Sequence, residues 1–247
     1  MSRMEPMLYE KVILGSDREV QRFITCLRQR RSPHTFARGA VKRLCIFGVR
    51  MPEVTLEILE YCTGVTAFAM WNQTRAHSER MQEAVDALPL LTELSLTMSS
   101  IFFSIAPSFA KLDMVHRITR LEILDGWILW TSTVGIEEMT WLTHLALQLQ
   151  LWHTSVQHIR KILDCCSALK VVLLHANCDR TEANDWLEAR GIYDIRIVWT
   201  GDSTWVNWNI IGLDQESCDL WDYASEIVAW RRKNDGTYRY NTQDQEC

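Results

Sequence analysis

One short pattern of apolar and polar positions recurs seven times along the chain. In the stretch from Leu142 to Leu147 the first, fourth and sixth residues are apolar, and a polar pair separates the first two. The same frame also begins at Val41, Val65, Leu91, Ile118, Leu169 and, most weakly, Ile192. Its starts are 24, 26, 27, 24, 27 and 23 residues apart. Seven matches in register are difficult to obtain by chance, so repeated structural units are predicted.

The frame predicts the fold of each unit. Side chains alternate between the faces of a strand, so the fourth and sixth residues point the same way. One unit cannot bury this apolar side alone, whereas stacked units share a continuous interior. The period lies within the roughly 20–29 residues of leucine-rich repeats. We therefore predict an α/β fold: a leucine-rich-repeat-like right-handed solenoid with one parallel sheet of about eight strands on its concave side and helices and irregular segments on its convex side.

The flanking segments differ from the repeats. The pattern from Ser16 to Glu19 is a capping box that predicts the start of a helix, and apolar residues at helical spacing predict another helix before the C-terminus. We expect one continuous domain in four parts: an N-terminal capping unit (1–40), the solenoid (41–199), a C-terminal cap (200–233) and a flexible tail (234–247).

Composition narrows the class of protein. The 247 residues are 47% hydrophobic and 23% charged, with a net charge of −5 that argues weakly against a nucleic-acid binder. The N-terminus lacks the apolar core of a signal peptide, and no run is long enough for a membrane span. Eight scattered cysteines without a CxxC pair indicate reduced core thiols. We expect a soluble protein of the cytoplasm or nucleus that binds neither nucleic acid nor membrane.

No motif predicts a catalytic, cofactor-binding or metal site. His153 and His158 lie near Cys165 and Cys166, but their spacing matches no zinc finger or ribbon. The chain has neither a Gly-x-Ser-x-Gly elbow nor a glycine-rich nucleotide loop. We therefore expect a protein-interaction module rather than an enzyme. Two alternatives stay open: an enzyme with an unrecognised site in the Trp199–Trp208 region, and a truncated paralogue without activity.

The concave face is the predicted binding surface. Alternation places the third, fifth and seventh residues of each frame there, opposite the buried fourth and sixth. Trp71 would then be an exposed aromatic anchor, unless it packs beneath the loop that follows it. Trp71, Arg120 and His144 are predicted to carry the main contacts with a protein partner. The full predicted set is Arg43, Phe47, Trp71, Glu93, Arg120, Glu122, His144, Gln148 and His175.

Three stretches resemble the fungal, agaricomycete-type F-box-associated leucine-rich-repeat proteins. They run from Pro6 to Leu14, through the repeat set including Cys166 to Val172, and from Asp219 to Arg232. The resemblance implies a repeat domain that recruits a target protein to a ubiquitin ligase, while an F-box binds the adaptor of the cullin ligase. The chain begins at about the end of that F-box. The expected partner is therefore an unidentified target protein, with an adaptor joining only if an F-box is supplied elsewhere.

Overall fold

The computed structural model describes seven segments of the chain: 5–71, 78–102, 108–125, 133–149, 155–176, 180–200 and 220–234. Its strands form one eight-stranded sheet in which every neighbouring pair is parallel and the spatial order follows the chain. This confirms the predicted α/β class and the single parallel sheet. The strands are β1 (Lys11–Leu14), β2 (Arg43–Phe47), β3 (Ala67–Trp71), β4 (Glu93–Leu96), β5 (Arg120–Ile123), β6 (His144–Leu149), β7 (Val171–Ala176) and β8 (Ile197–Thr200).

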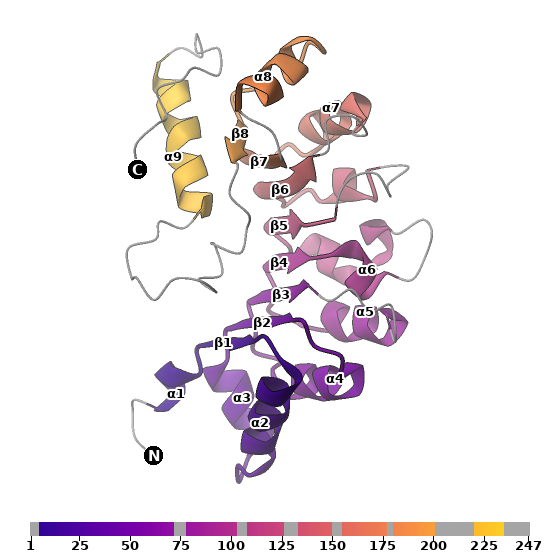
Figure 1. The fold of residues 1–247 in the computed structure, drawn as a ribbon, viewed down its shortest axis with the longest axis vertical. Helices are drawn as coiled ribbons and strands as arrows, with labels where there is room; N and C mark the ends of the chain where they lie inside the picture. The colour runs from indigo at the N-terminus through magenta and orange to yellow at the C-terminus, as the bar shows by residue number, and fades with distance from the viewer. Residues whose placement is uncertain are drawn as a thin grey trace.

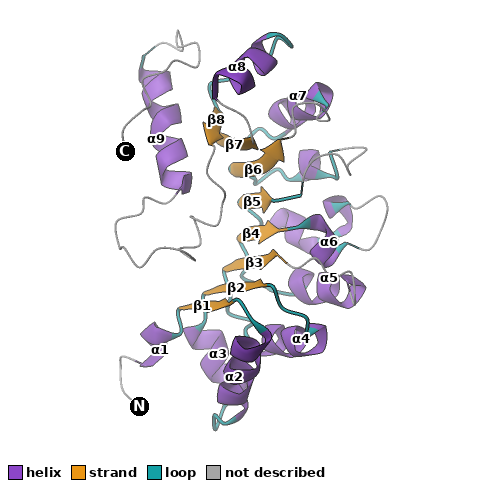
Figure 2. Cartoon of the chain, in the orientation of Figure 1, coloured by secondary structure: helices purple, strands orange, loops and turns teal. Residues whose placement is uncertain are grey.

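Helices connect successive strands and lie to one side of this ladder (Figures 1 and 2). In the described part of the chain the α-helices are α1 (Glu5–Leu8), α2 (Asp17–Arg28), α3 (Pro33–Ala40), α4 (Pro52–Tyr61), α5 (Ser78–Asp86), α6 (Met98–Ile101), α7 (Val156–Cys165), α8 (Arg180–Glu188) and α9 (Leu220–Lys233). Short 3-10 helices η1 (Phe109–Lys111), η2 (Asp113–His116) and η4 (Ile136–Glu138) replace α-helices in the middle of the chain.

The predicted capping box is present at the start of α2. The hydroxyl of Ser16 accepts a hydrogen bond from the backbone N–H of Glu19 at 3.3 Å. The carboxylate of Glu19 in turn accepts from the N–H of Gly15 at 2.7 Å, one residue earlier than in the usual box. Both bonds satisfy backbone donors where the chain turns from β1 into the helix.

The fourth residues of the frames form the centre of the core. Leu94, Leu121 and Leu145 are at most 1% exposed, as predicted, and they lie on adjacent strands in matched register. Together with the sixth residues they pack against the helices in one apolar cluster. We call this side of the sheet the core face, and the side that carries the third, fifth and seventh residues the opposite face.

Threonine at the second position of the frame ties the repeats together. Each of four threonine hydroxyls donates to a backbone carbonyl of the preceding repeat: Thr66 to Lys42, Thr92 to Thr66, Thr119 to Thr92 and Thr143 to Thr119, over 2.9–3.3 Å. We call this row the threonine ladder. It satisfies carbonyls at the turn into each strand and explains why the frame has a small polar residue there.

The weakest match of the frame is two residues out of register. The sequence predicted Ile195 as the inward fourth residue, whereas Ile197 is the residue that lies beside Val172. A turn centred on Asp194 causes the delay, because its side chain accepts from the backbone N–H of Arg196 at 2.9 Å and its carbonyl accepts from the N–H of Ile197 at 3.1 Å. The strand therefore starts only after this turn.

Helix α9 lies on the opposite face, away from α4, α5, α7 and α8 (Figure 1). Its apolar side packs onto β6, β7 and β8 through Trp221, Ala224, Ile227 and Val228. Arg231, only 3% exposed, also donates to the carbonyls of Ile195 and Ile197 beside the last strand. The helix that we expected to close the end of the stack thus covers part of the sheet surface as well. The expected tail lies almost wholly outside the described residues.

Candidate functional site

The third-position residues form a charged row across the start of the opposite face. In register order the row contains Lys11, Arg43, Ala67, Glu93, Arg120 and His144. Glu93 lies between two guanidinium groups, 3.2 Å from Arg43 and 4.0 Å from Arg120. The arginine side chains are 33% and 32% exposed, and that of Glu93 is 13% exposed. The two arginines of this row are partly accessible to a partner, and three predicted contact residues, Arg43, Glu93 and Arg120, lie together.

The fifth-position row beside it is buried. From β2 onwards it contains Cys45, Ala69, Ser95, Glu122, Ala146, Leu173 and Val198, each at most 2% exposed. The expectation that this whole face is solvent-exposed is therefore wrong. Alternation placed these side chains on the correct side of the sheet, but it carries no information about what packs on that side.

Trp71 is buried, in contrast to the predicted exposed anchor. Its side chain is 7% exposed, and its indole N–H donates to the hydroxyl of Ser95 at 2.9 Å. The Ser95 hydroxyl donates onward to the carboxylate of Glu122. The Trp71 ring also lies 6.1 Å from that of Phe47, which is half-buried. The alternative in which Trp71 is a packing residue is the one that agrees with this burial.

Two further predicted contact residues join this buried network. Glu122 is 2% exposed and His175 is 7% exposed, with 3.8 Å between a carboxylate oxygen of the glutamate and Nε2 of the histidine. Neither side chain is available to a partner in this structure, which corrects their prediction as contact residues. Gln148 lies beside His175 in the register and stays partly accessible.

His144 contacts α9 and is only partly exposed to solvent. Its Nε2 lies 3.2 Å from the hydroxyl of Ser225, its Nδ1 lies 2.8 Å from that of Thr143, and its ring meets Trp221 edge-on at 5.6 Å. Burial is the largest cause that lowers the pKa of His144 to about 4, and the cations Arg120 and Lys170 contribute to this shift against the opposing effect of Asp222. His144 therefore packs against α9 and stays partly exposed, and its predicted role as a contact residue stays a prediction.

A sequence signal for this coverage exists and was missed. Val171, Leu173 and Val198 are apolar at positions where most other repeats have polar or small residues, and each is at most 1% exposed beneath α9. Apolar residues on both faces of a strand indicate a strand that is covered on both sides. Reading the odd positions of the last repeats would have indicated a docking site for α9.

The suspected metal ligands do not converge. Cys166 is buried and donates to the carbonyl of Ile136 at 3.3 Å, whereas Cys165 beside it is exposed. Among the residues that the structure describes, no group of three or more His, Cys, Asp or Glu side chains is placed to hold a metal ion. His153 lies outside that part of the chain. His158 and Cys165 thus join no described metal centre.

Three cysteines are buried thiols of the kind the sequence predicted. Burial raises the pKa of Cys45 and of Cys62 to about 12, and that of Cys166 to about 11. At neutral pH they are protonated and unreactive, because the thiolate is the nucleophilic form.

The alternative enzyme site was expected in the Trp199–Trp208 region. Trp199 is buried at β8, and the rest of this region, apart from Thr200, lies outside the described residues.

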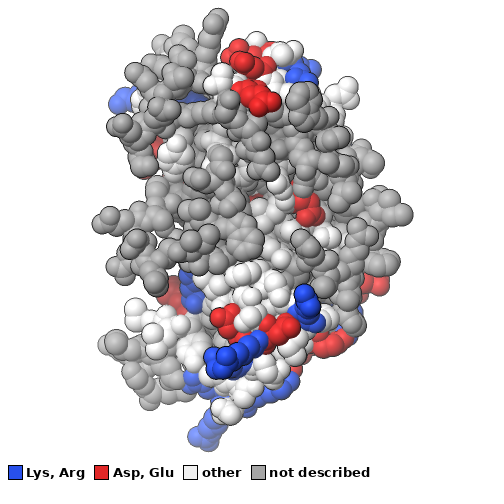
Figure 3. All heavy atoms as spheres, in the orientation of Figure 1, with Lys and Arg blue, Asp and Glu red and all other residues white. Residues whose placement is uncertain are grey.

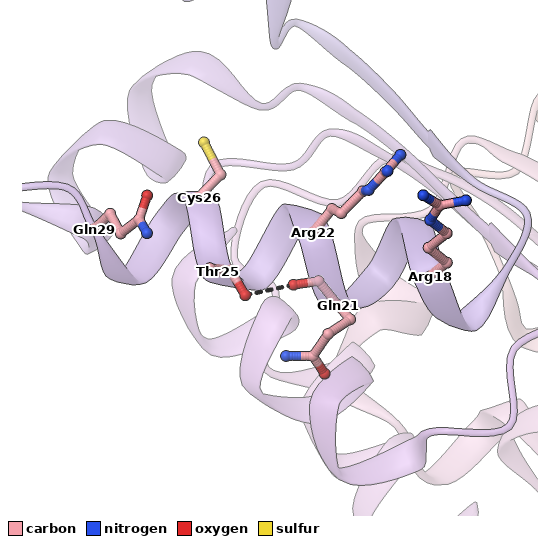
Figure 4. Close-up of a pocket in the computed structure, with 6 residues that line it drawn as sticks. All are labelled: Arg18, Gln21, Arg22, Thr25, Cys26 and Gln29. Carbon is pink, nitrogen blue, oxygen red and sulfur yellow. Dashed lines mark hydrogen bonds between the residues drawn. The ribbon is translucent and has the colours of Figure 1, made fainter.

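Two surface hollows lie on the helical side of the protein. One, of about 400 Å³, is lined by Arg18, Gln21, Arg22, Thr25, Cys26 and Gln29 (Figure 4). All six belong to the region of α2 and its end, and Thr25 bonds only to a backbone carbonyl of the same helix. The other, of about 480 Å³, lies between α3 and the end of α4 and is lined by His34, Thr35, Arg38, Gly39, Lys42, Glu60, Thr63 and Leu90.

The charges on the drawn face are mixed. In Figure 3 basic and acidic side chains lie next to each other below the centre of the view, and neither sign forms an extended area of its own there. In the part of the chain that the structure describes, no helix combines the length and the apolar character needed to cross a bilayer.

Comparisons with protein-family models, with curated proteins and with solved structures found no match. The geometry of the chain itself is therefore the basis for assigning a function.

Proposed function

We propose that this chain is a leucine-rich-repeat-like right-handed solenoid that serves as a protein–protein interaction module. Its proposed role is similar to that of the substrate-recruiting repeat domain of an F-box ubiquitin-ligase subunit, and its proposed partner is a target protein. A cullin-ligase adaptor would join only through an F-box supplied elsewhere. The concave side of this solenoid corresponds to the opposite face of the sheet.

The observation that carries the proposal is the accessible charged row on a rigid sheet. Arg43, Glu93 and Arg120 project from adjacent or nearby strands whose relative positions are set by backbone pairing and by the threonine ladder. Groups held on strands lose little conformational freedom when a partner binds, which favours specific recognition. Stacked repeats typically use such an extended face to bind other proteins.

Cross-linking can test which face binds. The chain would be used to capture proteins from extracts of its native cells, and the complexes would be treated with an amine-reactive cross-linker. Lys11 and Lys170 border the opposite face, whereas Lys111 and Lys161 lie on the helical side. We expect a reproducible, saturable partner that cross-links to the first group by mass spectrometry. The proposal fails if no protein binds saturably, or if the links involve only Lys111 and Lys161.

A further inference from the structure

Four cations of the described residues lie along the accessible part of the opposite face, with Glu93 between two of them and Asp222 of α9 near His144. Lys11 and Arg43 begin the row, Arg120 follows on β5, and Lys170 is exposed at the turn into β7, close enough to influence the charge of His144. We call these four residues the cationic row. Glu93 supplies one negative charge for its two arginine neighbours. The row is thus a locally positive strip on a protein whose net charge is −5.

Two titratable groups at opposite ends of the strip have pKa values that these cations help to lower. The pKa of Lys11 is lowered first by burial and then by Arg43. The pKa of His144 is lowered first by burial and then by Arg120 and Lys170. Proximity to cations disfavours the charged form of a base, so Arg43 adds to the effect of burial at Lys11, and Arg120 and Lys170 add to it at His144, where Asp222 acts in the opposite direction. An acidic ligand would relieve this repulsion.

The spacing of the strip suits an extended chain. Arg43 and Arg120 are three strands apart, and strands lie about 4.8 Å from each other, so roughly 14 Å separates their backbones. Their guanidinium groups converge, because both reach the carboxylate of Glu93, at 3.2 and 4.0 Å. An extended peptide advances about 3.3 Å per residue and directs alternate side chains to the same side, so carboxylates about two residues apart can reach both guanidinium groups. Arginine binds carboxylates through paired hydrogen bonds, which adds specificity to the charge attraction.

We propose that the cationic row binds an extended acidic segment of the partner protein, an inference that rests on the proposed function. The presence of Glu93 between the two arginines favours a peptide over a nucleic acid. A peptide can place an uncharged residue opposite Glu93, whereas a polynucleotide presents a phosphate at every step. The strip therefore selects separated carboxylates rather than a continuous negative backbone.

Fluorescence anisotropy with the full chain tests this recognition directly. The probe is a labelled peptide of about 12 residues with aspartate at every second position among serine and glycine, compared with its asparagine counterpart and with a single-stranded DNA of similar length. We expect the aspartate peptide to bind more tightly than both, with an affinity that falls as salt rises. Failure of the aspartate peptide to bind, or tighter binding of the DNA, would overturn the proposal.

Matched variants identify the surface. The double variant Arg43→Gln/Arg120→Gln should raise the Kd roughly tenfold or more, because two charge-assisted contacts are lost. The control Arg28→Gln/Arg80→Gln removes the same charge from two ion-paired arginines on the helical side, and its Kd should stay unchanged. Equal losses in both variants would show a general charge effect and refute the proposed strip. Thermal melting by circular dichroism checks that each variant folds.

A variant of opposite sign makes the test independent of any loss of folding. Glu93→Gln removes the acid from the strip and should tighten binding of the aspartate peptide, whereas Glu53→Gln on the helical side should not. Weaker or unchanged binding by Glu93→Gln would contradict the inference. If the captured partner cross-links to the opposite face while these variants leave its binding unchanged, the proposed function stands and the acidic recognition alone fails.

Discussion

At Gly64 the turn between α4 and β3 comes into direct contact with the backbone of α3. A Cβ atom at this position would lie 1.8 Å from the carbonyl oxygen of Arg38 and 2.7 Å from its carbonyl carbon. Both atoms belong to the backbone, so neither can move aside as a flexible side chain would. Glycine is required here for close approach, and the contact sets how the first repeat sits against the N-terminal unit.

Gly64→Ala should therefore lower the free energy of unfolding by roughly 1–3 kcal/mol, the usual cost of forcing extra atoms into a packed site. Gly39→Ala is the matched control, because a Cβ at Gly39 meets nothing within 4 Å and the residue is exposed within α3. It should raise stability by about 0.5–1 kcal/mol, since alanine favours a helix more than glycine does. Urea denaturation measures both, and equal effects would disprove the contact.

For single side chains, the sequence predicted the face of the sheet but not the degree of burial. Alternation assigned Trp71, Glu122 and His175 to the correct face of the sheet, because that depends only on position along a strand. They are buried among residues of other strands, as in the contacts of Trp71 with Ser95 and of Glu122 with His175, and a local pattern carries no information about those contacts. Arg43 and Arg120 stay accessible and are the part of the predicted site that the structure leaves available.

The elements themselves were more predictable than their packing. Seven copies of one frame predicted strands at nearly every correct place, and the shift at β8 arose where the match was weakest. The apolar stripe of α9 predicted a helix but not its position on β6, β7 and β8, because a stripe shows only that a helix packs against something. The apolar residues Val171 and Leu173 on the opposite face of β7 indicate the surface against which it packs.

Docking of α9 should depend on pH through His144. Its pKa falls from 6.5 to about 4 when α9 covers it, so an undocked or unfolded state takes up the proton first. Stability contributed by the neutral ring is complete above pH 6.5 and is lost as the pH falls towards 4. We expect hydrogen exchange in α9 to accelerate over this range more than exchange in β4.

The variant His144→Gln separates this effect from the titration of carboxylates. Glutamine stays neutral at every pH and keeps a hydrogen-bonding group near Ser225. Exchange in its α9 should depend less on pH between 6.5 and 4 than in the unmodified chain. An identical pH dependence in both proteins would show that other groups control the docking of α9.

On the scale of the whole molecule, the core face joins all eight strands into one apolar interior. The cluster runs from Val12 on β1 to Trp199 on β8 and includes residues of α2, α4, α5, α7 and α8. No strand pair is isolated from its neighbours, because each shares buried side chains with the strands on either side. A cavity in the middle of this interior should therefore weaken the molecule as a unit.

Leu145→Ala should lower the free energy of unfolding by roughly 2–5 kcal/mol, because Leu145 is fully buried on β6 and its truncation leaves a cavity. Leu90→Ala removes the same atoms from a side chain that is 47% exposed and should cost less than about 0.5 kcal/mol. Thermal and urea denaturation would compare the two. An unchanged melting midpoint for Leu145→Ala would show that the assigned register is wrong.

The threonine ladder also bears on the order in which the repeats can pack while the chain is synthesised. Each hydroxyl donor belongs to a later repeat and each carbonyl acceptor to the repeat before it. During translation the acceptor therefore leaves the ribosome before its donor exists. When a new repeat is synthesised, the repeat that accepts its hydrogen bond is already present, so the contact requires no later part of the chain. These contacts can therefore form repeat by repeat from the N-terminal end as the chain is made, and α9, which packs on β6, β7 and β8, follows those strands in the chain.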